Sequence, residues 1–292
     1  MASGALAHLT LSQTHVFCEE SAAPVIKSYS LDPMVHPLLP SSNTTTRNAD
    51  LIDMKELVGP IINMLSSLYC LVIGPGLGTV PITWQPVSEV MRKARGRLIP
   101  FVLDADGLKL VKKMLDLVKA VALDIEKIMS ESPDKTDDYR AQDAKIVGKL
   151  AEALGGVTIL RKGSYDVILN GLASLIQDTE GGMKHSGGQG DTLKGSLGTL
   201  MSWGASYHDR LWDSGENDSD QGSGGRIPLM KKRDIEREIE SDMRLSPTAF
   251  CLLVAWAGSG ITRECSRGVY KAEGCSMQAS DLTSQVHDSF LL

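Results

Sequence analysis

A glycine-rich stretch that leads into a helix carries the residues of this chain best suited to chemistry. It reads Gly187-Gly188-Gln189-Gly190-Asp191. Glycines let the backbone curl with its N–H groups pointing inward, which forms a cradle for anionic oxygens. The helix that follows begins with free N–H groups and a positive dipole end, and both favour phosphate. Asp191 would repel a phosphate unless it has a task, such as taking a proton from a hydroxyl that attacks the phosphorus.

The same residues also fit a purely structural role. Asp is a common helix N-cap, and glycine-rich loops are often only turns, so residue types alone leave both interpretations open. Gly190 and Gly195 have the separation of the two glycines in a Walker A loop, but Ser196 follows Gly195 directly, without an intervening Lys. Phosphate chemistry at this loop would therefore use another architecture.

Three other segments place polar or small residues just after expected strands. The first, 74–78, has the spacing G-x-G-x-G and is either a ligand-binding turn or a tight turn only. The second, 104–107, carries two carboxylates that could hold Mg²⁺ or orient a hydroxyl, or form an Asp-Gly turn. In the third, 161–166, Lys162 could reach nucleotide phosphates, or the segment is a charged β-hairpin turn. His185 lies near the glycine-rich stretch and is expected to be a loop residue.

Strand-like and helix-like runs alternate along the chain, which predicts an α/β fold with a mainly parallel sheet and helices on its faces. The expected strands are 14–17, 69–73, 98–103, 157–160 and 166–169, and the expected helices are 19–29, 87–95, 193–203 and a last one from Pro247 onward. We expect a single domain over residues 1–292. Polar inserts are expected near 130–143 and 206–243, the second of them disordered because its composition cannot pack a core.

Composition argues against several classes of function. The formal net charge of −6 disfavours binding to nucleic acid or to an anionic membrane. Five scattered cysteines form no CxxC pair and no metal-ligand spacing with histidines, so no protein-borne metal site is expected. No secretory signal or membrane span is recognised. The expected location is the cytoplasm, with a mitochondrial form left open.

Taken in order, several blocks of the chain resemble the ATP-dependent NAD(P)H-hydrate dehydratase family of the ribokinase-like superfamily. These blocks are 15–18, 23–29, 35–37, 71–78, 102–108, 155–163 with Asp166, 187–191 with the helix 193–203, 262–267 and 276–282. The resemblance implies a three-layer α/β/α fold with a mainly parallel central sheet. It also implies repair of the S-form of hydrated NADH or NADPH, in which ATP phosphorylates the ring hydroxyl and loss of phosphate restores the double bond. ATP and Mg²⁺ are the implied cofactors.

The resemblance also implies roles for individual residues. Asp191 would be the catalytic base in contact with the hydrated nicotinamide, and Gly76 would contact the same substrate. The implied ATP-binding residues are Lys162, Gly163, Ser164, Tyr165, Asp166, Gly181, Gly182, Met183, Lys184, His185, Ser186, Gly187, Gly188, Gln189 and Gly190. The implied partner is a small-molecule substrate, without nucleic acid or membrane, and a homo-oligomer is left open.

The chain departs from the family pattern in three places. It begins after the family's Ser-x-x-Tyr-Thr-Gly-Ala-Pro type motif, so we expect a truncated N-terminus with residues 2–6 matching the helix that follows the motif. Residues 122–126 stand where the family has Leu-Thr-Pro-Asn, and His185-Ser186 stands where it has Arg-Cys. Two alternatives follow from these departures: a truncated isoform that binds nucleotide without turnover, and a ribokinase-like small-molecule kinase.

Overall fold

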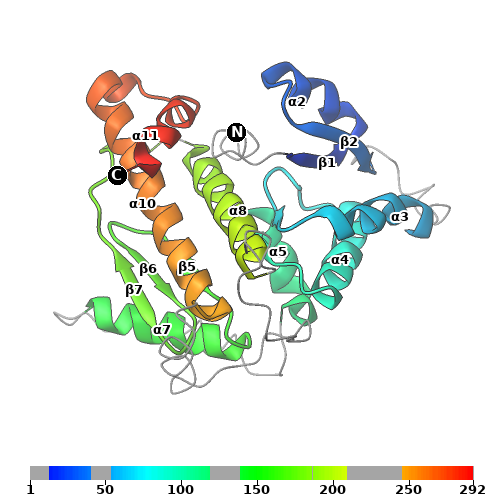
Figure 1. Ribbon diagram of the computed structural model, residues 1–292, viewed down its shortest axis with the longest axis horizontal. Coiled ribbons are helices and arrows are strands. Elements are labelled where there is room, and N and C mark those ends of the chain that lie inside the picture. The colour runs from blue at the N-terminus through cyan, green and yellow to red at the C-terminus, as the bar shows by residue number, and fades with distance from the viewer. Residues whose placement is uncertain (1–12, 41–53, 119–138, 186, 209–244, 292) are drawn as a thin grey trace, which may run out of the picture.

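The computed structural model of the chain describes residues 13–40, 54–118, 139–185, 187–208 and 245–291 (Figure 1). Two pairs of strands are parallel: β1 (His15–Glu19) with β2 (Met34–Leu39), and β3 (Leu71–Ile73) with β4 (Phe101–Leu103). β5 (Ile159–Arg161), β6 (Asp166–Leu169) and β7 (Ser174–Gln177) form an antiparallel sheet. The expected α/β class is confirmed.

The arrangement of the strands differs from the expected continuous, mainly parallel sheet. The described strands form three small sheets, and the last three strands are antiparallel. The connections explain this difference, because β5, β6 and β7 are joined by short turns, whereas a parallel pair needs a crossover of a dozen or more residues. Such crossovers join the earlier pairs: α2 (Ala23–Tyr29) lies between β1 and β2, and α4 (Pro81–Gly96) between β3 and β4.

A first hydrophobic core lies around β3 and β4. It is covered by α3 (Met54–Met64), α4, and α5 (Asp106–Lys113). Met91 of α4 and Leu110 of α5 are fully buried in it, and Leu71 and Ile73 contribute from β3. The apolar residues of α4 recur at helical spacing, which directs one face of the helix onto the strands.

The second half of the chain has three layers. α7 (Tyr139–Ala153) covers one face of the antiparallel sheet, and α10 (Pro247–Glu273) covers the other (Figure 1). Successive side chains of β6 alternate between these faces: Val167 packs in the cluster of α7, and Ile168 packs against Leu252 of α10. This is the α/β/α layering expected from the sequence.

Two polar segments were expected to be inserts. α7 already begins at Tyr139, so the end of the segment 130–143 belongs to a helix, and residues 119–138 lie outside the described residues. Likewise α8 (Gln189–His208) continues into the segment 206–243, of which residues 209–244 lie outside the described residues. No helix among the described residues is both long enough and apolar enough to cross a membrane.

α8 lies at the centre of the molecule and contacts β3, β4 and α10 (Figure 1). Two glycines permit its close packing against α10. A Cβ atom on Gly204 would lie 2.0 Å from the ring of Phe250, and one on Gly258 would lie 2.8 Å from a methyl group of Leu197. α8 therefore joins the two halves.

After α10 the chain forms a short helix, α11 (Val286–Phe290), whose Val286 is buried with residues of α10.

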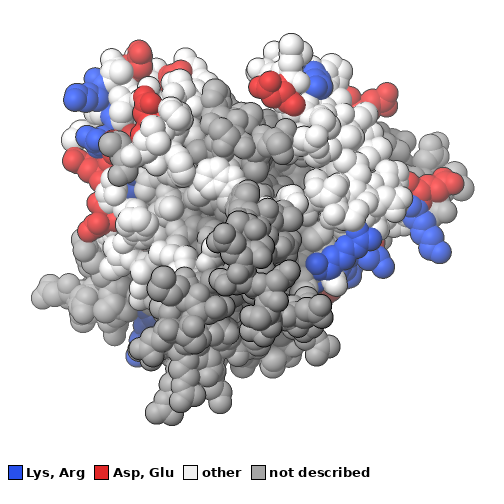
Figure 2. Space-filling model, viewed as in Figure 1, with Lys and Arg blue, Asp and Glu red and all other residues white. Residues whose placement is uncertain are grey.

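Acidic and basic side chains are interspersed over the described part of the face in Figure 2. Basic groups gather beside α4, whose last turn carries Lys93 and Arg95. Arg92 of the same helix forms an ion pair with Asp116, with 3.0 Å between the nitrogen and oxygen atoms. The net negative charge of the chain is therefore not concentrated in one acidic patch on the described part of this face.

Candidate active site

The carboxyl ends of β3 and β4 carry two turns that pack tightly together. A Cβ atom on Gly74 would lie 1.8 Å from the carbonyl oxygen of Asp104, and one on Gly107 would lie 2.6 Å from the carbonyl oxygen of Ile73. Gly74 also has a φ of 124°, a backbone conformation that suits glycine. The two turns therefore meet at one edge, as expected for neighbouring parallel strands. Glycine is required at this contact.

The two carboxylates of the second turn have different partners. Asp106 accepts hydrogen bonds from the backbone N–H of Gly78 at 3.0 Å and from Lys109 at 2.8 Å. The hydrogen bond from Lys109 is the main reason that the pKa of Asp106 lies below its ordinary value. Asp104 instead lies 3.5 Å from Nζ of Lys162 and 3.4 Å from Nζ of Lys194. Asp106 thus fixes the first turn, and Asp104 faces the start of α8.

The glycine-rich stretch forms the turn that begins α8. The helix starts at Gln189, earlier than the expected 193, and Gly188 has a φ of 100°. Asp191 lies in the first turn of the helix, and its N–H donates to the carbonyl oxygen of Gly188 at 2.8 Å. Because Asp191 is the third helical residue, it is not the N-cap, and the helix-cap interpretation of this residue is wrong.

Asp191 is held by a buried lysine one helical turn away. Oδ1 of Asp191 lies 2.6 Å from Nζ of Lys194, whose side chain is only 7% exposed. The carboxylate of Asp104 contacts the same ammonium group. Charged groups thus form a continuous series, which we call the ionic chain: Lys162, Asp104, Lys194 and Asp191.

Lys194 is the enclosed member of the ionic chain, whereas Asp104, its other inner member, has a side chain that is 21% exposed. The side chain of Lys162 is 51% exposed and that of Asp191 is 25% exposed. Gly190 lies beside this series, since a Cβ atom there would come within 3.6 Å of Asp104 and 3.7 Å of Lys162. An accessible ammonium group, helical N–H groups and an accessible carboxylate therefore lie together. This set fits a phosphate chain next to a hydroxyl that loses its proton.

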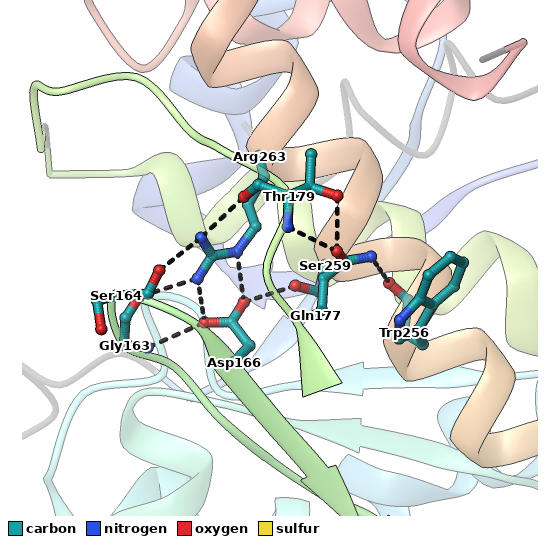
Figure 3. Close-up of polar contacts among 8 residues, drawn as sticks. All are labelled: Gly163, Ser164, Asp166, Gln177, Thr179, Trp256, Ser259 and Arg263. Carbon is teal, nitrogen blue, oxygen red and sulfur yellow. Dashed lines mark hydrogen bonds and ion pairs between the residues drawn. The ribbon is translucent and has the colours of Figure 1, made fainter. Parts of the chain in front are cut away.

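The segment 161–166 is the turn of a β-hairpin, since β5 and β6 pair in antiparallel fashion. Asp166, at the end of this turn, is buried and bound by α10 (Figure 3). The guanidinium group of Arg263 donates to both of its carboxylate oxygens, at 2.7 and 3.2 Å, and the hydroxyl of Ser259 donates at 2.5 Å. Burial acts to raise the pKa of Asp166, but the hydrogen bonds from Arg263, Ser259 and the N–H of Gly163 together lower it.

The same arginine also binds the backbone of this turn and of the segment after β7 (Figure 3). It donates to the carbonyl oxygens of Gly163 at 2.9 Å, Ser164 at 3.0 Å and Thr179 at 3.2 Å. Gln177 accepts two hydrogen bonds from Thr179 and donates to the carbonyl oxygen of Trp256 at 3.3 Å. We call this network the Arg263 clamp. It fixes the hairpin turn and the segment after β7 on α10.

The loop between β7 and α8 is also held on α10. A Cβ atom on Gly182 would lie 2.5 Å from the carbonyl oxygen of Ser266. Lys184 donates to the carbonyl oxygens of Cys275 and Met277, both at 2.7 Å, and its own carbonyl oxygen accepts from Gln189 at 3.0 Å. The loop is therefore fixed at both of its ends before the chain enters α8.

The structure separates the residues expected to form the site into groups. Lys162, Gly190 and Asp191 lie together around the ionic chain, whereas the side chain of Asp166 is engaged with α10 and that of Lys184 with residues just after α10. Tyr165 packs in the core beneath α7, and Gly76 lies exposed in the turn after β3. Exposed residues among the others are Gly163, Ser164, Met183, His185 and Gly187, half-buried ones are Gly181, Gly182, Gly188 and Gln189, and Ser186 lies outside the described residues.

Residue types alone missed two contributors to this region. Lys194 has a weak signal in the sequence, because it stands three residues after Asp191 on a helix, where side chains of opposite charge can pair. Arg263 belongs to a block that resembles the family, but nothing nearby in the sequence indicates its partner Asp166. Both become visible only when distant segments are brought together.

The fold and the site together define an α/β protein with a polar site at the ends of parallel strands and at a helix N-terminus. Two solved structures have this fold. A hypothetical protein from Streptococcus mutans aligns over 99% of this chain and 84% of its own, with a TM-score of 0.56 and 12% identity. The Bacillus subtilis protein YxkO aligns over 99% of this chain and 86% of its own, with a TM-score of 0.54 and 13% identity.

Sequence comparison identifies the family. A profile described as NAD(P)H-hydrate dehydratase matches residues 1–216. Proteins named ATP-dependent (S)-NAD(P)H-hydrate dehydratase are similar to this chain in Emericella nidulans (51% identity over 98% of this chain and 81% of that protein) and Aspergillus fumigatus (51% over 99% and 82%). The Mus musculus protein of the same name is 32% identical over 95% of this chain and 69% of its own. The chain belongs to the NAD(P)H-hydrate dehydratase family, as its motifs predict.

Proposed function

We propose that the protein is an ATP-dependent dehydratase that returns the S-form of hydrated NADH and NADPH to NADH and NADPH. Membership of the family supports the reaction, and relatives of this name in fungi and mouse cover nearly the whole chain. The observation that carries the proposal within the structure is the placement of Asp191. Its carboxylate is accessible, ion-paired and located at the start of a helix that favours phosphate.

In this reaction Asp191 takes the proton of the ring hydroxyl while the hydroxyl oxygen attacks the terminal phosphorus of ATP. ADP leaves, and the hydroxyl becomes a phosphate ester. The bond between the ring carbon and the ester oxygen then breaks, phosphate departs with the electron pair, and loss of a proton from the neighbouring carbon restores the double bond. Phosphate is a far better leaving group than hydroxide, which is the physical reason for consuming ATP.

The phosphates of ATP fit the end of the ionic chain at Lys162. Lys162 carries an exposed ammonium group, and the turn 187–190 presents backbone N–H groups at the start of α8. These groups would orient the phosphate chain toward Asp191 and stabilise charge that develops during transfer. The other expected contacts of ATP in 163–166 and 181–186, and that of the substrate with Gly76, stay predictions.

Mg²⁺ does not fit a site formed by the described residues alone. Among them, no three His, Cys, Asp or Glu side chains are grouped so that they could hold a metal ion. Asp104 and Asp106 are both paired with lysines. Magnesium commonly binds through substrate phosphates with one or two carboxylates, so we propose that it enters with ATP. The cytoplasmic location, the single domain and the oligomeric state also stay predictions.

Turnover of hydrated NADH by the purified chain tests the proposal. With ATP and Mg²⁺, we expect the near-ultraviolet absorbance of NADH to return, as it does with a relative of proven activity run in parallel. Phosphorylated product without reduced nicotinamide would support a small-molecule kinase instead. Thermal stabilisation by ATP without any product would support a nucleotide-binding protein that lacks turnover. Either of these results contradicts the proposed function.

Asp191→Asn tests the base itself. The amide keeps the size and polarity of the side chain but cannot take a proton, so we expect kcat to fall by about 10²–10⁴-fold. Affinity for ATP, measured by titration, should change little. Asp288→Asn on α11 is the matched control, because Asp288 is an exposed carboxylate far along the chain from the ionic chain. Full turnover by Asp191→Asn would refute the assignment.

A further inference from the structure

Lys194 is a buried cation that the proposed reaction has not yet used. Its side chain is 7% exposed, and its ammonium group lies 2.6 Å from Asp191 and 3.4 Å from Asp104. Burying an ammonium group costs several kcal/mol unless it is paired. The fold accepts this cost at a residue whose ammonium group pairs with the carboxylate expected to act as base. That placement suggests a function beyond stability.

The ammonium group of Lys194 would orient the carboxylate of Asp191. Their contact occupies Oδ1, so the other carboxylate oxygen is left for the substrate hydroxyl. Oδ2 of Asp104 holds the same ammonium group in turn. The base is thereby fixed in direction.

Lys194 differs from Lys162, although both contact Asp104. Lys162 is 51% exposed, so it is placed to meet a ligand that comes from solvent. Lys194 is enclosed and has two carboxylate partners, which suits a group that stays where it is. The two lysines should therefore affect different steps of one reaction.

We propose that Lys194 is a positioning residue for the dehydration, which holds the carboxylate of Asp191 oriented for removal of the hydroxyl proton. This inference rests on the proposed function. It assigns Lys162 to binding of ATP and Lys194 to the chemical step. The charged groups that face Asp191 in the described structure are Lys194 on its own helix and, through that lysine, Asp104 after β4 and Lys162 in the β5–β6 turn.

The experiment compares Lys194→Met with Lys162→Met on hydrated NADH. Methionine keeps most of the length of the side chain and removes its charge. For Lys194→Met we expect kcat to fall about 10²-fold with little change in KM for ATP, because a misplaced group costs rate more than binding. For Lys162→Met, KM for ATP should rise about 10- to 100-fold.

Controls separate this effect from misfolding. Lys93→Met, at an exposed lysine paired with Glu89, should change neither kinetic constant. The double variant Asp104→Asn with Lys194→Met removes one charge of each sign, so it keeps the balance of charge and should fold even where the single variant does not. We expect the double variant to retain the low kcat.

The outcomes that overturn the proposal are distinct from failure of the proposed function. A wild-type chain that restores no NADH contradicts the dehydratase function itself. With an active wild type, a Lys194→Met variant of normal kcat contradicts the role of Lys194 alone. A variant in which only KM for ATP rises also overturns it, because Lys194 would then be a phosphate ligand. Normal kcat in the folded double variant has the same consequence.

Discussion

Arg263 shows how one side chain can organise residues that are far apart in the sequence. Its guanidinium group binds Asp166 through two nitrogens and donates to carbonyl oxygens of the β5–β6 turn and of Thr179 (Figure 3). A planar fork with five donors suits several acceptors at once, which the single ammonium group of lysine does not. Arg263 thereby fixes the turn that carries Lys162 on α10, so the exposed ammonium group of Lys162 projects from a rigid turn.

Arg263→Met should therefore destabilise the protein strongly. It leaves the buried carboxylate of Asp166 without its cation, and breaking a buried pair in this way typically costs about 3–5 kcal/mol. Urea denaturation measures the loss of unfolding free energy. Arg267→Met is the control, because Arg267 pairs with Glu264 on the exposed side of the same helix and should have little effect. Equal losses for the two variants would contradict the importance of burial.

The Arg263 clamp also predicts how stability depends on pH. The pKa of Asp166 is lower in the folded protein than in the unfolded chain, where an aspartate titrates near about 3.9. A depressed folded pKa contributes stability that is fully present above the unfolded value and is lost as pH falls through the folded value. The difference in unfolding free energy between wild type and Arg263→Met should thus be constant near neutral pH and shrink below about pH 4. A difference that grows in acid would contradict the clamp.

Single residues also mark where sequence reasoning stops. Asp191 and the glycines before it could be identified because an anion cradle is a local property of backbone and residue type. Lys194 reads in the sequence as an ordinary helical lysine, and its burial depends on Asp104, which another part of the chain supplies. Asp166 could be placed after a strand, but not assigned to Arg263, because that contact joins residues 97 positions apart.

At the scale of elements, the turns after β3 and β4 decide whether the site can form. Gly74→Ala should destabilise the protein by more than the strain that alanine meets at positive φ, since its methyl group would overlap the carbonyl oxygen of Asp104. Gly78→Ala is matched to it, with a φ of 73° but with open space around the added atom. Gly78→Ala should cost about 1–2 kcal/mol of backbone strain. Gly74→Ala should cost about 1–3 kcal/mol more, because its methyl group meets Asp104 and because a φ of 124° suits alanine less well than 73°.

Urea denaturation of both glycine variants, with turnover measured on the same samples, checks this prediction. The extra cost at Gly74 arises from contact between the two turns together with its less favourable φ. If the variants lose equal stability, the two turns do not pack as described. A folded Gly74→Ala chain should also lose turnover. The added methyl group would displace Asp104, and this displacement would disturb Lys162 and Lys194, which both contact its carboxylate.

The elements that were predicted correctly have strong local patterns. The apolar runs of β3, β4 and β6 and the helical spacing of α8 and α10 are visible without any partner. Two strands, β2 and β7, were not expected from the sequence. β2 contains Pro37, which lacks an N–H group and disfavours a strand, and β7 is a short edge strand with two exposed residues. α7 begins in a polar segment because tertiary packing of its later apolar residues decides its formation, not its first turn.

At the scale of the whole molecule, α8 makes the two halves interdependent. It contacts the strands of the first core and α10 of the second half, and its first turn carries Asp191, the proposed base. Ligand binding at that turn is therefore expected to stabilise both halves. Because Asp104, Lys162 and Asp191 come from three different segments, a ligand that bridges them resists separation of any one of them.

Two tryptophans allow this coupling to be measured. Trp84 is buried in the first core, and Trp256 lies on α10 in the second half. One variant would retain only Trp84 and the other only Trp256. The fluorescence of both should report the same urea midpoint, because neither half keeps its packing once α8 has unfolded. Saturating ATP at about 100 times its dissociation constant should raise both unfolding free energies by about 2.7 kcal/mol. Separate midpoints, or a shift confined to one reporter, would show that the halves unfold independently and that α8 does not couple the site to the whole fold.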